Sequence, residues 1–585
     1  MTSGTLAKNF MKLFWDKMVA RLEPPFLIRE TRNRKYTEAT IDIVAVSALN
    51  SAVEYYLKHN VLSGLGMAAI ALQTAQDCYD EIVVEEFKEL IKNLGNWKSP
   101  GADGIFNYYI KWLPSLHEPL YKAVQRMCLD AGREDDWLYR GVTYLIPKNE
   151  QPTSPSQYRP ITCMSNLYKL MTRCVTESLK REVEARGLLT ENQMGTKRRV
   201  QGAKEHALTN IVINSKYEHG LHSTWVDVMK AFDSVDHRYL MHILESLHLP
   251  GWVVSFVRHT ISRWHIDIRW GKEALMTKAI GKGILQGDSL SPLLFVLCMG
   301  PLSRKLNALY PPVKVRTPDD RILATNHLLY IDDLKIFTEE EGMLKKMTEE
   351  TQKFFEAIGF RMNRDKSATS SPECSNAAKL LEGTGTYKYL GITEDGNSRT
   401  SAAMLEEIIR VIVTRLQLLL KTDLSAKNLF RAINQYTLTV INYFIGVVPT
   451  EKDDMARIDR LVRKHLRQAG VIKDNSNVSR LYLPRKEMGR GLHNLQHKAE
   501  AMMLRLWLTL TKDESRSVRR AAICQHYRSS YHRVSLIVQE LKGDYGLHVL
   551  PQDPIEKTIR DLRPAQTKKL HDIINETKLH KLLFS

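Results

Sequence analysis

The segment "LLYIDDLKIF", residues 328–337, places two adjacent aspartates inside an otherwise apolar run. The apolar residues on both sides predict a β-hairpin with Asp332 and Asp333 near its turn. Two neighbouring carboxylates repel each other, which costs stability unless a cation or solvent at the turn relieves the repulsion. A polar turn and a metal site both explain the pair, and other parts of the chain must distinguish them.

Length and charge narrow the class of protein. A chain of 585 residues is too long for one core and predicts roughly three or four subdomains. Its 43% hydrophobic and 26% charged residues are typical of a folded protein. Lys and Arg total 84 against 66 Asp and Glu, a formal net charge of +18. Because the basic residues are spread along the chain, the excess favours a nucleic-acid partner over a membrane surface.

The sequence also argues against membrane, secretory and zinc-binding classes. No apolar run approaches the roughly 18 residues that span a bilayer. The first 25 residues lack an apolar signal core, and Asp16 and Glu23 argue against a transit peptide. We therefore expect an intracellular protein. No C-x-x-C pair occurs, so we expect free thiols in a reducing compartment at Cys78, Cys128, Cys163, Cys174, Cys298, Cys374 and Cys524.

Hydrophobic patterning divides the chain into broad regions. The first 80 residues are predicted to be largely helical and include the basic stretch "RETRNRK" at 29–35. Helical stretches then alternate with Gly- and Pro-rich loops, and residues 225–395 hold strand-like runs such as "STWVDVM" and "YKYLGI". After Gly396 the pattern is helical, with one helix predicted to begin near Ser425 as its N-cap. An α/β core between helical flanks is the expected architecture.

A second acidic motif, "WVDVMKAFDSVDH", occupies residues 225–237. It predicts a strand that ends at Asp227 and a turn that leads into a helix. Three convergent carboxylates, Asp227, Asp332 and Asp333, would suit two Mg²⁺ ions. One ion would activate a 3′-hydroxyl and the other would stabilise a departing pyrophosphate, as in polymerases and nucleases. The alternative is that Asp227 caps the following helix.

A third stretch, "KGILQGDSLSPLLFVLCMG", spans residues 282–300. Gly283 and Gly287 bracket a tight turn, and Ser291-Pro292 should open an apolar helix. A glycine beside Gln286 allows the backbone to approach a base or sugar closely. By itself this is an ordinary joint between a loop and a helix.

The three motifs, in this order, resemble the palm of a reverse transcriptase. Further blocks resemble the enzymes of non-LTR (LINE-type) retrotransposons, and the clade with a restriction-like endonuclease is the most similar. The resemblance spans roughly residues 80–500. The blocks are "NWKSPGADGI" (96–105), "YRPITCMSNLYKLMTR" (158–173), "GFRMNRDKS" (359–367), "YKYLGI" (387–392) and "LYLPRKEMGRGL" (481–492).

The resemblance implies a right-hand polymerase fold of mixed α/β class, with an antiparallel palm sheet. The expected parts are a helical N-terminal extension, fingers, palm, helical thumb and a helical C-terminal extension, at 1–80, 81–224, 225–395, 396–499 and 500–585.

The resemblance also assigns the chemistry. Asp227, Asp332 and Asp333, with the carbonyl of Val228, match the ligands of two Mg²⁺ ions, for which Mn²⁺ is a substitute. Lys366 matches a lysine that protonates the leaving pyrophosphate, a general-acid role. A solvated surface lysine is the alternative for Lys366.

Nucleotide and primer contacts follow from the same resemblance. Lys148 and Arg159 match the residues that clasp the triphosphate, for which a point charge and a planar fork are suited. Without the palm motifs, the preferred interpretation of both residues would be solvated cations on surface loops. Phe232 matches the bulky residue that excludes a ribose 2′-hydroxyl. The other matches are the nucleotide-binding loop at Gln286 and Gly287 and the primer-gripping hairpin at Tyr389, Leu390 and Gly391.

A basic helix is predicted at 455–470, in the region that resembles the thumb. It carries five cations against a single acid, Asp459. Phosphates of a template–primer duplex suit such a face better than a solvated helix surface, which normally mixes both signs. The stretches at 195–200 ("GTKRRV") and 29–35 are weaker candidates for template RNA contacts. The helix cations are Arg457, Arg460, Arg463, Lys464 and Arg467.

The resemblance predicts an RNA-directed DNA polymerase that copies retroelement RNA in target-primed retrotransposition. Its partners would be an RNA template, a DNA primer or target and deoxynucleoside triphosphates, with no membrane, and the nucleus would be its location. The alternatives are a group II intron-type maturase and a non-catalytic nucleic-acid-binding relic. We find no Cys/His knuckle or nuclease block, so we expect primer extension without nicking of an intact duplex.

Overall fold

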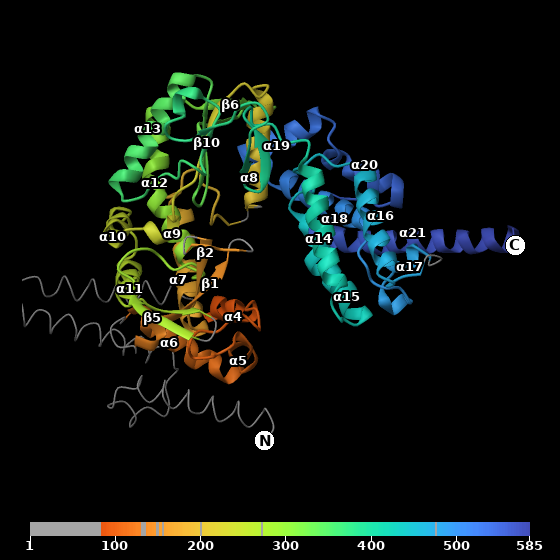
Figure 1. Ribbon diagram of the computed structural model, residues 1–585, viewed down its shortest axis with the longest axis horizontal. Coiled ribbons are helices and arrows are strands. Elements are labelled where there is room, and N and C mark those ends of the chain that lie inside the picture. The colour runs from red at the N-terminus through yellow and green to blue at the C-terminus, as the bar shows by residue number, and fades with distance from the viewer. Residues whose placement is uncertain are drawn as a thin grey trace, which may run out of the picture. The chain divides into compact units, whose positions relative to one another are not determined.

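The computed structural model describes residues 84–129, 136–147, 151–154, 157–198, 200, 202–270, 273–473, 477–550 and 552–584 (Figure 1). The expected helical extension at 1–80, the stretch at 29–35 and Lys148 lie outside the described residues. The chain forms two compact units that interleave along the sequence. Unit 1 comprises residues 1–189, 230–300 and 358–360, and unit 2 comprises residues 190–229, 301–357 and 361–585.

Unit 1 contains a four-stranded sheet in the order β2-β1-β4-β5. Strand β1 (Arg140–Pro147) pairs antiparallel with β2 (Tyr158–Cys163) and parallel with β4 (His265–Trp270), which pairs antiparallel with β5 (Glu273–Ala279). Arg140 on β1 makes two 2.8 Å hydrogen bonds to the carboxylate of Asp267 on β4. This bidentate pair fixes the register of the parallel strands.

The described part of unit 1 also contains helices. They are α4 (Val84–Lys92), α5 (Asn107–Trp112), η1 (Pro114–Leu116), α6 (His117–Leu129), η2 (Asp136–Tyr139), α7 (Asn166–Ala185), α9 (Ala231–Ser234), α10 (His237–Ser246) and α11 (Gly251–Ser262). Helix α12 (Ser291–Leu309) begins in unit 1 and ends in unit 2. The predicted helix start at Ser291-Pro292 is confirmed.

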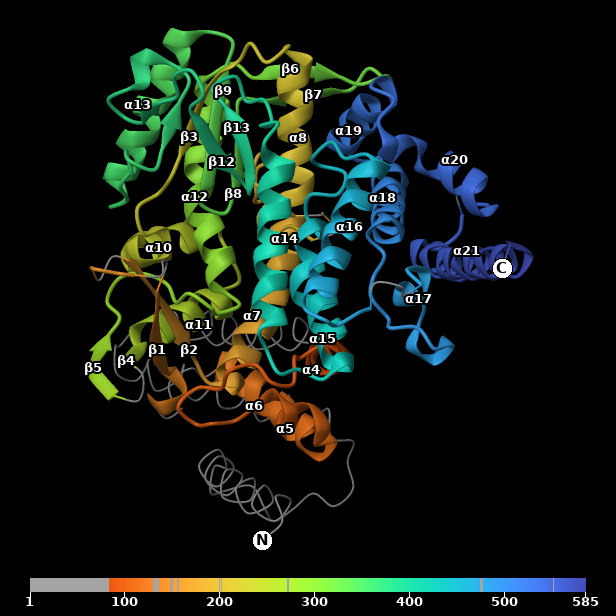
Figure 2. The same ribbon diagram turned by 45° about the vertical axis from the view of Figure 1, so that its right-hand side comes forward.

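Unit 2 is built on a five-stranded sheet in the order β11-β10-β3-β9-β8. The short β10 and β11 pair is parallel, and the other three pairings are antiparallel. Figure 2 shows β3, β8 and β9 side by side. The predicted hairpin of residues 328–337 is β8 and β9. The strand bounds are β3 (His222–Val226), β8 (His327–Tyr330), β9 (Asp333–Thr338), β10 (Ala368–Thr369) and β11 (Lys379–Leu380).

The two faces of this central sheet have different neighbours because side chains alternate along a strand. Thr224 on β3 receives a hydrogen bond from Thr348 of helix α13 (Glu341–Ala357), which covers one face. On the other face, Lys335 of β9 contacts Asn210 of helix α8 (Ala203–Lys216) and Glu394 of the hairpin β12 (Thr386–Tyr389) and β13 (Ile392–Asp395).

The region after residue 400 is helical, as the sequence predicts. Most of its buried apolar side chains form one large cluster with those of α8, and Leu483, Leu570 and Ile574 form a separate small one. Helix α15 starts directly after Ser425, although that side chain makes no capping hydrogen bond. The elements are α14 (Met404–Leu420), α15 (Ala426–Ala432), η5 (Ile433–Thr437), η6 (Leu438–Asn442), α16 (Lys452–Gln468), α17 (Ser479–Tyr482), η7 (Arg485–Glu487), α18 (Leu495–Lys512), α19 (Val518–Ser529), α20 (Arg533–Tyr545) and α21 (Ile555–Phe584).

Buried ion pairs bind the C-terminal helices to α8. Arg520 of α19 donates two hydrogen bonds, of 3.2 and 3.1 Å, to the carboxylate of Glu205 on α8. Arg520 also bonds Asp513, and Arg519 bonds Glu191. Arg321, beside the small hairpin β6 (Val313–Arg316) and β7 (Ile322–Thr325), donates to two carbonyls of the loop before α19. Residues 500–545 are therefore an integral part of unit 2.

Two further sequence expectations have a structural outcome. The six cysteines among the described residues are buried, and Cys78 lies outside the described residues. Within the described part of the chain, no helix is long and apolar enough to cross a membrane.

Candidate functional site

The turn between β8 and β9 carries the paired aspartates. Tyr330 and Asp333 pair across the hairpin, which leaves Ile331 and Asp332 as the two turn residues. Ile331 has a φ of 60°, in the left-handed region that a β-branched side chain rarely adopts. Such a conformation costs about 1–3 kcal/mol and persists where neighbouring structure imposes it. The turn that presents Asp332 and Asp333 is therefore strained.

The side chain of Gln193 holds this strained turn. Its Oε1 accepts a hydrogen bond from the Ile331 amide at 3.0 Å, and its Nε2 donates to the Ile331 carbonyl at 3.3 Å. The neighbouring Gly195 lies so close that a Cβ there would be 2.8 Å from the Ile331 nitrogen. The sequence did not single out Gln193. The basic residues just after it, at 195–200, were the only feature of this region that pointed to a function.

Asp227 lies at the end of β3 and is held by the turn at 361–367. Asn363 donates from Nδ2 to one carboxylate oxygen of Asp227 at 3.0 Å. The Asp227 amide donates to Ser367 Oγ at 3.0 Å, and Val228 forms a bridge with Met362. Lys366 belongs to the same turn and is exposed. Asn363 is a site residue that the sequence did not single out, although it stands in the block "GFRMNRDKS".

The three acids influence one another electrostatically. Burial, reinforced by the charges of Asp332 and Asp227, raises the pKa of Asp333 to about 7, although part of its surface is open to solvent. Burial and Asp227 likewise raise the pKa of Asp332. Within the described residues, none of the three carboxylates forms an ion pair with a cationic side chain. The end of the sheet therefore holds concentrated, uncompensated negative charge.

The donor set suits a hard divalent cation. Carboxylate and carbonyl oxygens are the ligands that Mg²⁺ prefers, and a cation would relieve the mutual repulsion. Among the described residues, no three His, Cys, Asp or Glu side chains are already gathered into a metal site. The three acids are thus neighbours of the right chemistry, whose side chains must still converge on an ion.

The hairpin β12–β13 lies against the same face of the sheet as the acids. Its turn residues Leu390 and Gly391 have φ values of 47° and 80°. The Tyr443 hydroxyl donates to the Leu390 carbonyl at 2.7 Å, and buried Tyr389 bonds His206 at 2.9 Å. Burial raises the pKa of Tyr387, and Asp333 is the next contributor to that rise. Tyr387 is thus a further neighbour of the acids that sequence reasoning did not single out.

Unit 1 holds the predicted nucleotide loop. Gly287 has a φ of 106°, and a Cβ there would lie 3.3 Å from the Thr162 carbonyl. Asp288, next to it, is buried and accepts a 2.6 Å hydrogen bond from Thr172. Burial raises the pKa of Asp288 to about 6. Asp288 thus anchors the loop to helix α7 through Thr172. Gln286, two residues before Asp288, is half-buried.

The other predicted nucleotide contacts also belong to unit 1. Phe232 stacks on buried Phe295 with ring centroids 5.2 Å apart, which fixes its ring. Arg159 is exposed on β2. Strand β1 ends at Pro147, one residue before Lys148, which lies outside the described residues. Phe232, Arg159, Gln286 and Gly287 are in unit 1, whereas the acids are in unit 2.

The cations of helix α16 are not equivalent. Arg457 makes two hydrogen bonds to Glu406, at 2.6 and 3.1 Å, and Arg463 donates to the Tyr482 hydroxyl. Arg460 and Lys464 are exposed, and Arg467 is half-buried. Of the three acids of α16, Asp453, Asp454 and Asp459, only Asp459 is buried, and it receives the amide hydrogen of Leu495 at 3.0 Å. The exposed face is therefore basic, but fewer of its cations are available than the sequence suggests.

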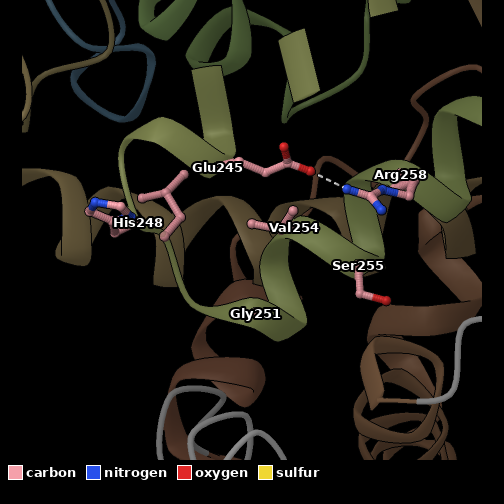
Figure 3. Close-up of a pocket in the computed structure, with 7 residues that line it drawn as sticks. Glu245, His248, Gly251, Val254, Ser255 and Arg258 are labelled. Atoms are coloured by element: carbon pink, nitrogen blue, oxygen red, sulfur yellow. Dashed lines mark hydrogen bonds and ion pairs between the residues drawn. The ribbon is translucent and has the colours of Figure 1, made fainter. Parts of the chain in front are cut away.

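A hollow of about 490 Å³ lies between α10 and α11 in unit 1 (Figure 3). Its lining includes Glu245 and Arg258, which form an ion pair with each other. Because its single acid is already paired, this hollow lacks the chemistry of a metal site.

The chain was compared with known protein families, curated proteins and solved structures. Residues 146–393 match the family model described as reverse transcriptase (RNA-dependent DNA polymerase). The Pol polyprotein from type-2 retrotransposable element R2DM of Drosophila melanogaster is 25% identical over 449 residues, which cover 71% of this chain and 40% of that protein. The RNA-directed DNA polymerase from mobile element jockey, from the same species, is 26% identical over 420 residues, or 66% of this chain and 43% of that protein.

The chain thus spans about two fifths of the length of these two relatives. Among solved structures, apo telomerase from Candida tropicalis aligns with 83% of this chain and 96% of its own length, at 11% identity and a TM-score of 0.35. The matched residues 146–393 include Asp227, Asp332 and Asp333. The chain therefore carries a reverse transcriptase domain of the kind found in non-LTR, LINE-type retrotransposon proteins.

Proposed function

We propose that this chain is the RNA-directed DNA polymerase of a non-LTR retrotransposon, which extends a DNA 3′ end on an RNA template with deoxynucleoside triphosphates. The observation that carries the proposal is the end of the central sheet. Three carboxylates from two strands influence one another there with no cationic side chain paired to them among the described residues. A folded domain tolerates such repulsion where a cation and a phosphate substrate are to be bound.

The proposal includes the anatomy of a right-hand polymerase. Residues 81–224 would be the fingers, 225–395 the palm and 396–499 the thumb, between extensions at 1–80 and 500–585. The mainly antiparallel central sheet and the all-helical region after residue 400 support this division.

The acids would provide the metal site. Asp227, Asp332, Asp333 and the carbonyl of Val228 would hold two Mg²⁺ ions, with Mn²⁺ as a substitute. Bound there, the ions would polarise the attacking 3′-hydroxyl and stabilise the leaving pyrophosphate.

The protein's own groups hold the acids in place. Gln193 fixes the turn that presents Asp332, and Asn363 orients the carboxylate of Asp227. Lys366, exposed on the same turn as Asn363, would donate a proton to the leaving pyrophosphate.

Residues of unit 1 would select and hold the nucleotide. Phe232, whose ring is fixed by stacking on Phe295, would leave no room for a ribose 2′-hydroxyl. Lys148 and Arg159 would clasp the triphosphate, and the loop of Gln286 and Gly287 would lie beneath the nucleotide. Removal of the Phe232 ring in Phe232→Ala should raise ribonucleotide incorporation and leave the dependence on Mg²⁺ unchanged. Unaltered sugar discrimination in that variant would remove Phe232 from this role.

The remaining groups would position the duplex. The hairpin of Tyr389, Leu390 and Gly391 lies next to the acids, where the primer 3′ end must be for transfer. The exposed Arg460 and Lys464 of α16 would contact duplex phosphates. In a retrotransposon this reaction would copy element RNA at a chromosomal target, so the nucleus is the proposed location.

Primer extension by the purified chain tests the proposal. A DNA primer annealed to an RNA template should be extended with dNTPs and Mg²⁺, and extension should stop when the ion is chelated. The same primer without a template is the control for terminal addition. A well-folded chain that binds the duplex but never extends it would favour the non-catalytic relic. A strong requirement for a structured intron RNA as template would favour the maturase.

A further inference from the structure

The central sheet contains a fully buried cation that the proposed chemistry does not use. The Lys335 side chain is 0% exposed and stands on β9, two residues after Asp333. Burying an ammonium group is costly unless its hydrogen-bonding groups are all satisfied. Its position in the sheet indicates what the cation is for.

All three ammonium hydrogens of Lys335 have partners. Nζ donates to Asn210 Oδ1 at 2.8 Å, to Glu394 Oε2 at 2.9 Å and to Ser398 Oγ at 2.9 Å. Nζ also lies 4.7 Å from the ring centroid of Trp225. The environment is therefore built around the cation, with no donor left over.

The carboxylate of Glu394 also accepts hydrogen bonds from groups other than Lys335. Its carboxylate accepts from Asn210 on α8 and from Trp225 Nε1 on β3, the latter at 3.2 Å. The side chain is 2% exposed. The pair thus joins four elements: strand β9, strand β3, helix α8 and the hairpin β12–β13.

Strand periodicity relates this pair to the acids. Side chains two residues apart on a strand share a face, so Lys335 lies on the same face as Asp333, and Trp225 on the same face as Asp227. Trp225 and Lys335 are direct partners across the ladder. Trp225 and Lys335 are each two residues from an acid, Asp227 at the end of β3 and Asp333 on β9. Through Glu394, this cross-strand pair connects both strands to the hairpin that carries Tyr389.

We propose that Lys335 and Glu394 are a positioning pair, which sets the hairpin β12–β13 relative to Asp227 and Asp333 and so places the primer 3′ end. The inference rests on the proposed function, since it assigns the hairpin to the primer. An apolar pair could fill the same space, but directional hydrogen bonds fix orientation as apolar contacts do not. Neither residue touches substrate.

The test uses charge removal that spares packing. Lys335→Met should raise the half-saturating concentration of primer–template about tenfold and leave the KM for the nucleotide unchanged. Fluorescence anisotropy should show a similar weakening of binding to the same duplex without nucleotide. The double variant Lys335→Met/Glu394→Gln leaves no unpaired buried charge. It should therefore unfold at a higher temperature than Lys335→Met and still keep the raised primer KM.

Arg533→Met is the matched control. Arg533 is a half-buried cation, with an 11% exposed side chain, that pairs with Glu540 on α20, away from the hairpin. Its loss should lower thermal stability without changing primer affinity. A wild-type primer KM in the double variant, or an equal rise in Arg533→Met, would overturn the inference. If the wild-type chain binds duplex but extends nothing, the proposed function fails, and the anisotropy comparison still decides whether the pair positions the hairpin.

Discussion

The acidic end of the central sheet and helix α16 both carry several like charges, but the two regions differ in whether those charges have partners within the protein. At the sheet end, burial and neighbouring carboxylates raise the pKa of Asp332 and Asp333, and none of the three acids pairs with a cation among the described residues. On α16, Arg457 is bound to Glu406 and Arg463 to Tyr482, so part of the basic run holds the fold together. Uncompensated charge therefore distinguishes a binding site from a charged structural element better than the number of charged residues does.

Removal of one acid should produce the largest effect. Asp332→Asn keeps the shape of the turn but removes a proposed metal ligand, so primer extension should fall by about 10³-fold or more. The same change relieves repulsion with Asp227, so the thermal unfolding temperature should stay equal or rise. Primer extension and calorimetry on one preparation measure both. A variant that is both active and unchanged in stability would show that the acids are an ordinary polar turn.

Loss of the two hydrogen bonds between the Gln193 side chain and Ile331 should have the next largest effect. Gln193→Leu removes both hydrogen bonds to the strained turn, so activity should fall about 10- to 100-fold while duplex affinity is kept. Single-turnover extension with saturating duplex measures this. Ile331→Gly is the matched variant, because glycine adopts a positive φ without strain. If Gln193→Leu is as active as the wild type, the turn does not depend on these hydrogen bonds.

The cations of α16 should differ in their effect on duplex binding, according to whether each already forms an ion pair within the protein. Replacement of exposed Arg460 and Lys464 with Gln should weaken duplex binding several-fold and lower the slope of log affinity against log salt by roughly 1–2. Arg457→Gln, which loses an ion pair to Glu406, should leave that slope unchanged. Titrations at several salt concentrations decide between the two. Equal slopes for all variants would mean that α16 does not face the duplex.

Asp459 should give the smallest effect, and it concerns stability alone. Burial raises the pKa of Asp459 to about 7, so between pH 4 and 7 the folded state binds a proton that the unfolded state has lost. Its contribution to stability therefore falls as the pH rises through this window. The free energy of unfolding of Asp459→Asn should match that of the wild type near pH 4 and exceed it by on the order of 4 kcal/mol at pH 8. A stability difference that does not change with pH would contradict this assignment.

Local patterns in the sequence predicted the elements that bear the acids. The apolar runs around Asp332 and Asp333 indicated a hairpin, and the run before Asp227 indicated a strand, because alternation and turn residues act within a few positions. The start of α12 at Ser291 followed from the placement of Pro292 in its first turn. These features depend on neighbours in sequence, so the sequence was sufficient for them.

The supporting residues were not predictable in the same way. Gln193 contacts Ile331, and Asn363 contacts Asp227, across more than 130 positions of the chain. Nothing in the residues around Gln193 or Asn363 identifies the partner. Lys335 was read as part of a strand, and only the tertiary structure shows that its charge is buried against Glu394. Asp459 was counted with the basic face of α16, whereas the structure places it in the core.

The ion pair between α19 and α8 has a consequence for the order in which the protein is made. Arg520 lies 315 residues after Glu205, and ribosomes add about 5–20 residues each second, so Glu205 waits roughly 15–60 s for its partner. Helix α8, and the sheet face it covers, should therefore mature only after residue 520 has been synthesised. A nascent chain stopped at residue 512 should remain sensitive to protease over residues 203–216. Messages that end before this point would then yield no fully folded central sheet, so helix α19 is a checkpoint on synthesis as far as residue 520.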